Sequence, residues 1–313
     1  MSPFRSGVVA LVGRPNVGKS TLLNRMVGER VAIVSPKPQT TRTKILGVVQ
    51  RPSGQLVVVD TPGLHRPRTA LGKLMEERAQ AAMEEVDVVC LLVEAPAGKS
   101  RGPSQLSPAE RSILALLGRS RKPRVLVVNK VDAGPKAPLL PLAAEYQEAV
   151  GFDETFFISA RTGEGVEELV ESLIRRLPEG EPLYPPETFT DQSERVLAAE
   201  LIREQVLRHC RAEVPHASAV TIDLFDESER APLPGARGPL QGLVRIAATV
   251  FVERESQKAI VIGKQGAMLK SIGTDARAAL ERLLGAHVYL SLRIKVEPRW
   301  RESERGLRRV GIR

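Results

Sequence analysis

Three groups of residues in the first half of the chain combine glycine, lysine, hydroxyl and carboxylate groups at spacings that suit phosphate chemistry. They are Gly13-Arg14-Pro15-Asn16-Val17-Gly18-Lys19-Ser20, Asp60-Thr61-Pro62-Gly63 and Asn129-Lys130-Val131-Asp132. The first matches the pattern G-x-x-x-x-G-K-S, in which backbone N–H groups and a helix N-terminus surround an anion. We expect Lys19 to reach the terminal phosphates of a nucleotide and the Ser20 hydroxyl to ligate Mg²⁺.

The elements that must position the first group fit this role. Residues 8–12 form a short apolar run typical of a buried parallel strand, and residues 21–27 have apolar positions at helical spacing. A glycine loop between a strand and a helix places the phosphates at the helix N-terminus, where the helix dipole favours negative charge. The expected phosphate contacts therefore extend to Thr21.

The third group predicts which base is bound. Guanine presents two adjacent donors, N1–H and the N2 amino group, that adenine lacks, and one carboxylate accepts both; this is the role expected of Asp132. Asn129 would reach the N7/O6 edge of the base, and Lys130 would lie over the ring. After a further apolar run, Ser159 and Ala160 would bring a backbone N–H to guanine O6. The ligand is therefore expected to be GTP or GDP.

The second group predicts a metal site. Asp60 ends an apolar run and can bind Mg²⁺ through water, and Gly63 leaves room for its N–H to meet the γ-phosphate. A threonine of the stretch Gln39-Thr40-Thr41-Arg42-Thr43 would complete the Mg²⁺ shell. The sequence does not separate Thr40 from Thr41, and we favour Thr41. The expected metal ligands are Ser20, Thr41 and Asp60, and the expected catalytic groups are Lys19, Thr41 and Gly63.

Composition indicates an intracellular protein of about two domains. The chain has 313 residues, and its apolar fraction of 42% is sufficient for buried cores. Cys90 and Cys210 are far apart and are expected to be free thiols. No apolar run approaches the roughly 20 residues of a membrane span. The formal net charge is +9, and residues 293–313 hold 8 Lys or Arg against 3 Asp or Glu, which fits contact with a polyanion or a solubilising terminal helix.

The pattern along the chain predicts two domains joined by a linker. Strand-like and helical patterns alternate from residue 7 to about 177, which predicts a doubly wound α/β domain with a mostly parallel sheet. The cluster of prolines that follows excludes regular structure and indicates a linker. Two stretches, 96–108 and 227–242, are expected to be exposed loops. The predicted boundaries are 1–178 for the first domain, 179–192 for the linker, 193–300 for the second domain and 301–313 for a basic tail.

The second domain is predicted to be a smaller α+β domain in the order helix, strand, strand, helix, helix, strand. The turn Gly263-Lys264-Gln265-Gly266 follows an apolar run that ends at Ile262 and precedes an amphipathic helix over 267–284. This order is typical of a type II KH domain, whose glycines let two helix ends approach the backbone of about four nucleotides. We expect RNA contacts from this turn, Ile262 and Lys270. The aromatic fraction of 4% argues against an RRM-type stacking sheet.

These motifs together resemble the Era GTPases of bacteria over essentially the whole chain. The resemblance rests on G-R-P-N-V-G-K-S, Q-T-T-R, D-T-P-G, N-K-V-D and S-A, followed by V-I-G-K-Q-G. It implies a GTPase that binds the 3′ end region of small-subunit (16S) ribosomal RNA and acts in assembly of the small ribosomal subunit. It also implies a cytoplasmic monomer that can associate peripherally with the inner face of the cell membrane. The nucleotide-site residues that it carries over are Gly13 to Ser20, Thr40 or Thr41, Asp60 to Leu64, and Asn129 to Asp132.

Two positions bear on the rate of hydrolysis. Leu64 stands where many regulatory GTPases carry a glutamine that orients the attacking water, and an aliphatic side chain cannot do this. In related GTPases with such a replacement, an asparagine at the position of Asn16 helps to hold a K⁺ ion that neutralises charge between the β- and γ-phosphates. Asparagine also tolerates tight turns, which is the simpler reading of this residue. We expect slow hydrolysis and, as a hypothesis, acceleration by K⁺.

Two other classes of protein remain compatible with parts of the sequence. A phosphotransferase can share the phosphate loop, but N-K-V-D and the lack of an obvious lid region argue against it. An RNA-binding adaptor with a purely structural nucleotide pocket also fits, because hydrolysis is a rate and not a motif.

Overall fold

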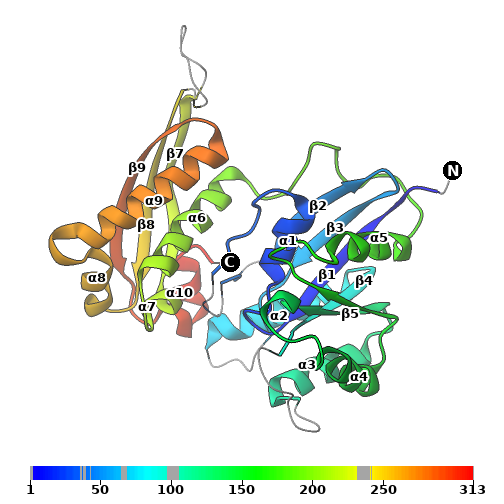
Figure 1. Cartoon of the computed structure of the whole chain (residues 1–313). Coiled ribbons are helices and arrows are strands. Elements are labelled where there is room, and N and C mark those ends of the chain that lie inside the picture. Colours follow the sequence, from blue (N-terminus) through cyan, green and yellow to red (C-terminus); the bar gives the residue numbers. More distant parts are fainter. Residues whose placement is uncertain are drawn as a thin grey trace. The chain divides into compact units, whose positions relative to one another are not determined.

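A computed structural model describes residues 3–35, 37, 40–42, 44–64, 69–96, 106–230, 240 and 242–312. The chain divides into two compact units, and the main boundary between them lies between Asp191 and Gln192 (Figure 1). Gln39 and Thr43 of the expected Q-T-T-R stretch, and most of the expected loops 96–108 and 227–242, lie outside the described residues.

The first unit is a doubly wound α/β domain, as predicted. Its six-stranded sheet has the order β2-β3-β1-β4-β5-β6, in which β2 runs antiparallel to β3 and the other neighbouring pairs are parallel. The strands are β1 (Arg5–Gly13), β2 (Ile45–Arg51), β3 (Gly54–Asp60), β4 (Val88–Glu94), β5 (Arg124–Asn129) and β6 (Glu154–Ile158). The helices are α1 (Lys19–Val27), α2 (Ala70–Glu84), α3 (Pro108–Arg119), α4 (Leu139–Val150) and α5 (Val166–Arg176).

Successive side chains along each strand point to opposite faces of the sheet, and helices cover both faces. In β1, Val9 and Leu11 point into a core cluster that includes side chains of α1 and α5. Ala10 and Val12 point to the opposite face, into a cluster with side chains of α2, α3 and α4. Because both faces of the sheet are covered, its strands are the continuous apolar runs that the sequence shows rather than alternating ones.

The parallel strands all end at the same edge of the sheet, and this edge gathers the predicted motifs. The last residues of β1, β3, β4, β5 and β6 are Gly13, Asp60, Glu94, Asn129 and Ile158. In open α/β sheets, ligands bind outside the carboxyl ends of the strands. The fold therefore brings the phosphate loop, the Asp60 group and the Asn129 group together although up to 116 residues separate Gly13 from Asn129.

The segment after α5 has no helix or strand but packs against the first unit along β2 and β3. Gln55 of β3 is fully buried; its Nε2 donates to Tyr184 O (2.7 Å), and its Oε1 accepts from the backbone N–H groups of Leu183 (2.7 Å) and Tyr184 (2.9 Å). Farther along, Phe189 O accepts from Val48 N (2.9 Å). The predicted linker is therefore irregular, as expected, and it is also held to the sheet.

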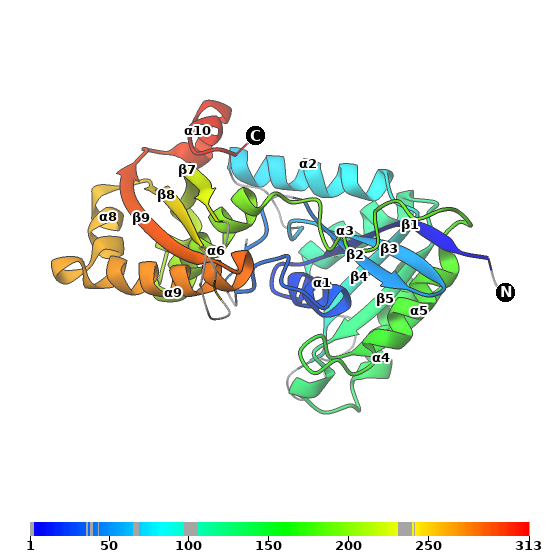
Figure 2. The ribbon, with the colours of Figure 1, turned by 90° about the horizontal axis from the view of Figure 1, so that it is seen from above.

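The second unit has the element order that the sequence predicts for a KH domain. Its three-stranded sheet has the order β7-β8-β9, with β7 and β8 antiparallel and β8 and β9 parallel. Helix α9 lies along one face of this sheet and α10 lies on the other side (Figure 2). The elements are α6 (Glu194–His209), α7 (Val214–Ala217), β7 (Ala219–Glu229), β8 (Leu243–Val252), α8 (Glu255–Ile262), α9 (Ala267–Leu284), β9 (His287–Val296) and α10 (Glu304–Arg309).

The basic C-terminal stretch folds onto the second unit. Trp300 is fully buried and its Nε1 donates to Ala217 O (2.9 Å), and Leu307 and Val310 are also buried. Three of its arginines form ion pairs within the unit, namely Arg301 with Glu253 (2.5 Å), Arg308 with Glu304 (3.0 Å) and Arg309 with Glu297 (2.6 Å). Glu297 and Glu304 are already among the 3 acidic residues of this stretch, so the fold adds only Glu253 to its balance and most of the excess positive charge remains.

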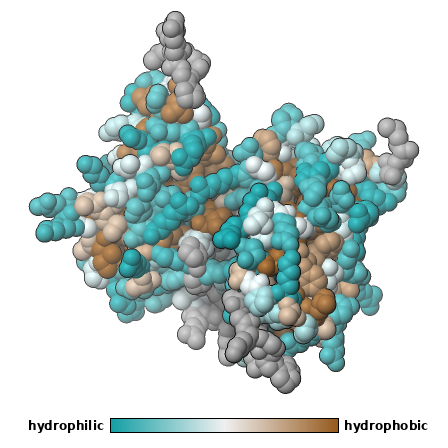
Figure 3. All heavy atoms as spheres, in the orientation of Figure 1, coloured by the Kyte–Doolittle hydropathy of each residue, from teal (hydrophilic) through white to brown (hydrophobic). Residues whose placement is uncertain are grey.

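No helix in the described part of the chain is long and apolar enough to cross a membrane. Most residues on the face shown in Figure 3 are hydrophilic, with hydrophobic residues scattered among them. Large hydrophobic side chains that are exposed lie on separate elements, among them Leu140 on α4, Leu224 on β7, Ile260 on α8 and Tyr289 on β9.

Candidate functional site

The phosphate loop joins β1 to α1, as the sequence predicts. Gly13 and Gly18 have φ angles of 149° and 103°, a region that favours glycine. Lys19 is buried, and its Nζ lies 3.2 Å from Gly13 O and 3.1 Å from Arg14 O, so the ammonium group sits inside the loop. Burial lowers the pKa of Lys19, and the nearby Asp60 carboxylate opposes this. A phosphate group in the loop would supply the negative charge that this buried cation lacks.

Three oxygen-bearing side chains meet beside the loop and fit a Mg²⁺ ion. Ser20 Oγ lies 2.6 Å from Asp60 Oδ2 and 2.9 Å from Thr41 Oγ1, and Thr41 Oγ1 lies 3.0 Å from the same carboxylate oxygen. The hydroxyl of Thr40 instead donates to Lys37 O (2.6 Å). The choice of Thr41 over Thr40, which the sequence leaves open, is therefore favoured by geometry.

The second carboxylate oxygen of Asp60 also supports a Mg²⁺ site here. Asp60 Oδ1 is buried and has no hydrogen-bond partner among the described residues, which is costly unless a ligand completes it. Burial raises the pKa of Asp60, while Lys19, Ser20 and Thr41 oppose the shift. A Mg²⁺ ion takes hard oxygen ligands and keeps several waters, so few protein ligands together with phosphate oxygens suffice.

The base-binding residues form a connected network. Asn129 is buried; its Nδ2 donates to Val17 O (2.8 Å) and its Oδ1 accepts from Ala160 N (2.9 Å). This one side chain thus ties the phosphate loop to the loop after β6. Asp132 accepts from Ser159 Oγ (2.6 Å) and pairs with the exposed Arg161 (2.7 Å), and both contacts lower the pKa of its carboxyl group. An ionised acceptor is what guanine recognition requires.

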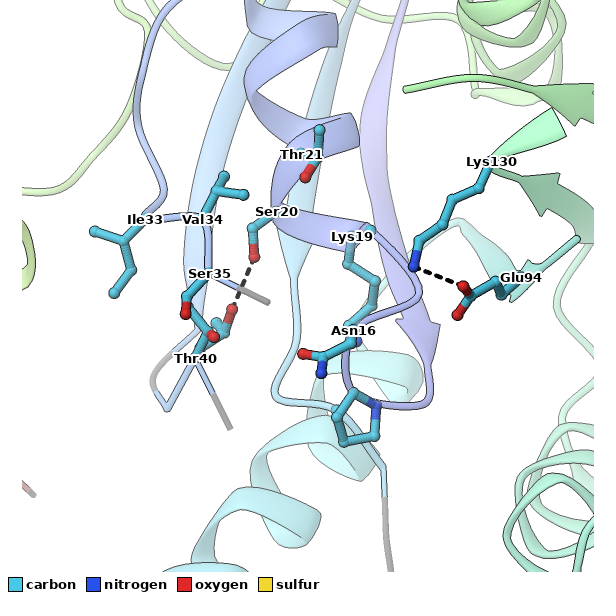
Figure 4. Close-up of a pocket in the computed structure, with 14 residues that line it drawn as sticks. Asn16, Lys19, Ser20, Thr21, Ile33, Val34, Ser35, Thr40, Glu94 and Lys130 are labelled. Carbon is cyan, nitrogen blue, oxygen red and sulfur yellow. Dashed lines mark hydrogen bonds and ion pairs between the residues drawn. The ribbon is translucent and has the colours of Figure 1, made fainter. Parts of the chain in front are cut away.

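A cleft of about 610 Å³ has the size of a nucleotide site and is lined by the phosphate loop, Ser20, Thr41 and Lys130. Asp60, Asn129, Asp132, Ser159 and Ala160 are not among the residues that line it. Figure 4 shows Asn16, Lys19 and Ser20 on its wall, with Lys130 and Glu94 on the other side. Lys130 Nζ lies 2.9 Å from Glu94 Oε1, which fixes the lysine that is expected over the base. The lining residues are Pro15, Asn16, Gly18, Lys19, Ser20, Thr21, Ile33, Val34, Ser35, Thr40, Thr41, Gly63, Glu94 and Lys130.

Four of these lining residues were missed by the sequence analysis, namely Glu94 and the stretch from Ile33 to Ser35. Glu94 ends β4 at the edge where the motifs gather, and this position is the signal that could have found it. The stretch from Ile33 follows a loop that Asn24 of α1 holds, because Asn24 Oδ1 accepts from Val31 N (3.0 Å) and Ala32 N (2.9 Å). No local pattern marks these residues.

The remaining predicted residues take supporting positions. A Cβ atom on Gly63 would lie 2.7 Å from Pro15 N, so glycine is needed for this close approach of the two loops. Leu64 is buried in the core cluster that includes Ala10 and Val12, and it therefore presents no polar group to an attacking water. Thr61 donates to Leu11 O (2.8 Å). Val17 and Val131 are buried, and Asn16 has a φ of 67°, a conformation that asparagine tolerates.

The predicted RNA-contacting turn lies between α8 and α9. Gly263 and Gly266 have φ angles of 73° and 79°, and a Cβ atom on Gly263 would lie 2.6 Å from the Cβ of Met268. This turn therefore needs its first glycine for packing. Lys264, Gln265 and Lys270 are exposed, so the two side chains of the turn and the first turns of α9 are open to a ligand.

The fold and the cleft define a P-loop GTPase joined to a KH domain. A family model described as "50S ribosome-binding GTPase" matches residues 8–130, and a model described as "KH domain" matches residues 213–301. The GTPase Era of Geobacter metallireducens is 47% identical over 99% of this chain and 98% of its own length, and that of Carboxydothermus hydrogenoformans is 44% identical over 99% and 98%. The chain belongs to the Era family of GTPases.

Solved structures agree with the assignment of this chain to the Era family. A variant of Aquifex aeolicus Era bound to GDP and aluminium fluoride is 39% identical, covers 98% of this chain and 99% of its own, and superposes with a TM-score of 0.87. A structure of Era with MgGDPNP and nucleotides 1506–1542 of 16S ribosomal RNA is also 39% identical, covers 99% of both chains and has a TM-score of 0.88. The fold class and the family resemblance predicted from the sequence are thereby confirmed.

The geometry of Asp132 gives a first testable expectation. Asp132→Asn should weaken GDP binding about ten- to a hundredfold, because an amide offers one acceptor to the two guanine donors, and loss of a charge-assisted hydrogen bond costs about 1.5–3 kcal/mol. Xanthosine diphosphate, whose O2 can accept from the new amide, should gain affinity. Competition titrations measure both. Asp153→Asn is the matched control, since this exposed aspartate accepts from Arg124 N at the start of β5. Unchanged GDP affinity would show that Asp132 does not bind the base.

Proposed function

We propose that this protein hydrolyses GTP with Mg²⁺ at the cleft, binds the 3′ end region of 16S ribosomal RNA through its KH domain, and acts in assembly of the small ribosomal subunit. The observation that carries the proposal is the pairing, in one chain, of the Ser20–Thr41–Asp60 cluster beside a phosphate loop with an exposed G-x-x-G turn. Near full-length similarity to an Era structure that holds a GTP analogue and 16S RNA nucleotides supports it.

The nucleotide-site residues predicted from the sequence have the following roles in this proposal. Lys19 would compensate charge on the β- and γ-phosphates, and Ser20, Thr41 and Asp60 would hold Mg²⁺, which would supply positive charge against the charge that develops during hydrolysis. Gly63 donates its N–H to the γ-phosphate. Thr41 would report the presence of that phosphate, because its hydroxyl lies with Ser20 and Asp60 at the metal site. The guanine contacts come from Asn129, Asp132, Ser159 and Ala160.

The domain limits proposed for these roles are 1–178 for the G domain, 179–192 for the linker, 193–300 for the KH domain and 301–313 for the tail. RNA contacts are assigned to Ile262, the turn from Gly263 to Gly266, and Lys270. The proposed setting is a cytoplasmic monomer that meets the small ribosomal subunit and associates peripherally with the inner face of the cell membrane. The basic residues of the tail support RNA contact nearly as strongly as the sequence suggests, because only the pair of Arg301 with Glu253 uses a carboxylate from outside the stretch.

The experiment that tests the proposal measures phosphate release from GTP and from ATP, with and without an RNA fragment that carries the 3′ end of 16S ribosomal RNA. Hydrolysis of GTP but not ATP, together with a gel shift of that fragment and not of a permuted one, is the expected result. A GTP rate no higher than background with RNA bound would favour the adaptor class. Transfer of phosphate to an acceptor other than water would favour the phosphotransferase class.

The buried Leu64 leaves hydrolysis without a side chain to orient water, and Asn16 suggests what replaces it. We expect K⁺ to accelerate GTP turnover and Na⁺ to do so poorly, because a cation held beside Asn16 would neutralise charge between the β- and γ-phosphates. Asn16→Ala should remove the difference between the two ions. Rates in KCl and NaCl at matched ionic strength decide this. Equal rates would mean that RNA or a ribosomal partner supplies the activation instead.

A further inference from the structure

Helix α1 reaches the base-binding loop through a residue outside every motif. Arg25 lies in the last turn of α1, and its Nε donates to Ala160 O (3.2 Å) while an Nη donates to Arg161 O. Ala160 and Arg161 belong to the loop after β6, 135 and 136 positions away along the chain. One guanidinium group therefore holds two consecutive carbonyl groups of this loop.

These two contacts fix the direction of a peptide group that matters for guanine. A trans peptide is planar, so its N–H points opposite to its C=O. Because Arg25 holds the carbonyl of Ala160, it also sets where the N–H of Arg161 points. The preceding peptide is held from another side, since Ala160 N donates to Asn129 Oδ1 (2.9 Å). The Ala160 N–H is therefore engaged by Asn129, and the Arg161 N–H, whose direction Arg25 sets, is the one that can meet guanine O6.

Other contacts in the loop cannot replace Arg25. Ser159 Oγ donates to Asp132 and accepts from Thr162 N, and Gly163 N donates to Ser159 O (2.8 Å). These bonds hold the peptide groups before Ala160 and after Arg161, but they leave the peptide between Ala160 and Arg161, with the Ala160 carbonyl, to Arg25. Removing the guanidinium group would let the middle peptide rotate while the rest of the loop stays in place.

We propose that Arg25 is a positioning residue for guanine recognition, which holds the carbonyls of Ala160 and Arg161 and thereby aims the N–H of Arg161 at guanine O6. The proposal rests on the assignment of guanine to the pocket of Asn129 and Asp132. It predicts a loss of affinity confined to bases that carry O6. Arg25 is exposed, so the effect is modest, about three- to tenfold in affinity.

The test compares three diphosphates on full-length Arg25→Ala with Mg²⁺ present: GDP, inosine diphosphate and 2-aminopurine riboside diphosphate. The first two carry O6 and the third does not. GDP and inosine diphosphate should lose affinity by the same factor, and the 2-aminopurine nucleotide should bind as it does to the unaltered protein. Equal loss for all three nucleotides, or no loss for any, would overturn the proposal.

Two further variants separate geometry from charge and from general stability. Arg25→Lys keeps the charge but cannot hold two carbonyls, so it should show an intermediate loss; full recovery would mean that only charge matters and would contradict the proposal. Arg51→Ala is the matched control, because Arg51 is a partly buried arginine that chelates Glu167 through bonds of 2.7 and 2.8 Å and touches no nucleotide residue. If the unaltered protein fails to prefer GDP over the 2-aminopurine nucleotide, the guanine pocket itself is wrongly assigned.

Discussion

Gly18→Ala should weaken GDP and GTP binding more than a hundredfold. A Cβ atom at this position would lie 2.2 Å from Asn129 Nδ2, and the residue has a φ of 103° that side chains rarely adopt. Asn129 would have to leave its place and lose its bonds to Val17 O and Ala160 N. Nucleotide binding would have to restore this geometry against the collision, so two hydrogen bonds and the guanine contact of Asn129, of about 1 kcal/mol each, sum to about 3 kcal/mol, which is a factor of at least a hundred.

The matched control for this prediction lies at the other end of the same helix. Gly28 also has a positive φ, 84°, but a Cβ atom there would meet nothing within 4 Å. Gly28→Ala therefore carries the strain without the collision and should keep nucleotide affinity. Isothermal titration with GDP and Mg²⁺ measures both variants, and a thermal melt without nucleotide checks that each folds. Equal losses in the two variants would mean that strain in α1, and not the contact with Asn129, decides binding.

The second large effect is expected at the G-x-x-G turn. Replacing Lys264 and Gln265 with Asp should abolish binding of the 16S 3′ fragment in a gel shift while GDP affinity is unchanged. Both side chains are exposed at the point where the glycines allow a phosphate backbone to approach, so two carboxylates there would repel it. If the variant binds RNA with the affinity of the unaltered protein, another surface binds the RNA.

A control with the same change in charge makes this result specific. Arg282 and His287 are exposed at the far end of α9 and the start of β9, and replacing both with Asp also changes the net charge by about −3 at neutral pH. An α-helix rises about 1.5 Å per residue, so Arg282 lies roughly 25 Å along α9 from the turn. The control should keep most of its RNA affinity in moderate salt. A similar loss in both variants would show only a general dependence on charge.

Much of the nucleotide site could be predicted because its residues stand in short motifs at strand ends. The G-K-S, D-T-P-G and N-K-V-D groups each follow an apolar run, and parallel strands must end at one edge, so the residues had to converge. The choice between Thr40 and Thr41 could not be made from spacing, because it depends on the path of a loop without periodicity. The structure favours Thr41 through its 3.0 Å contact with Asp60.

The parts that could not be predicted depend on pairs that are distant in sequence. Arg25 meets Ala160 across 135 positions, and no local pattern in α1 indicates this. The net charge of the C-terminal stretch can be counted from its own residues alone. The structure adds a partner from outside it, because Arg301 pairs with Glu253, 48 positions earlier. Trp300 is likewise held by a distant partner, because its Nε1 donates to the backbone oxygen of Ala217 in α7, 83 positions earlier.

The packing of the segment from Pro178 to Thr190 changes how far the two domains can separate. A free coil of 14 residues has a contour of roughly 50 Å and a root-mean-square span of about 20 Å. Here, however, Thr190 Oγ1 donates to Leu46 O (2.6 Å), and Ser193 is already the N-cap of α6. The chain between these two points spans three residue steps, or about 10 Å when fully extended.

The short free chain between the domains affects RNA binding through the effective concentration of RNA near the first domain. A domain tethered by about 10 Å samples a far smaller volume than one on a long coil, so an RNA segment held by the KH domain keeps its neighbouring nucleotides at a high effective concentration around the G domain. The fully buried Gln55, which plays no part in nucleotide chemistry, thereby helps to shorten the free chain between the two domains.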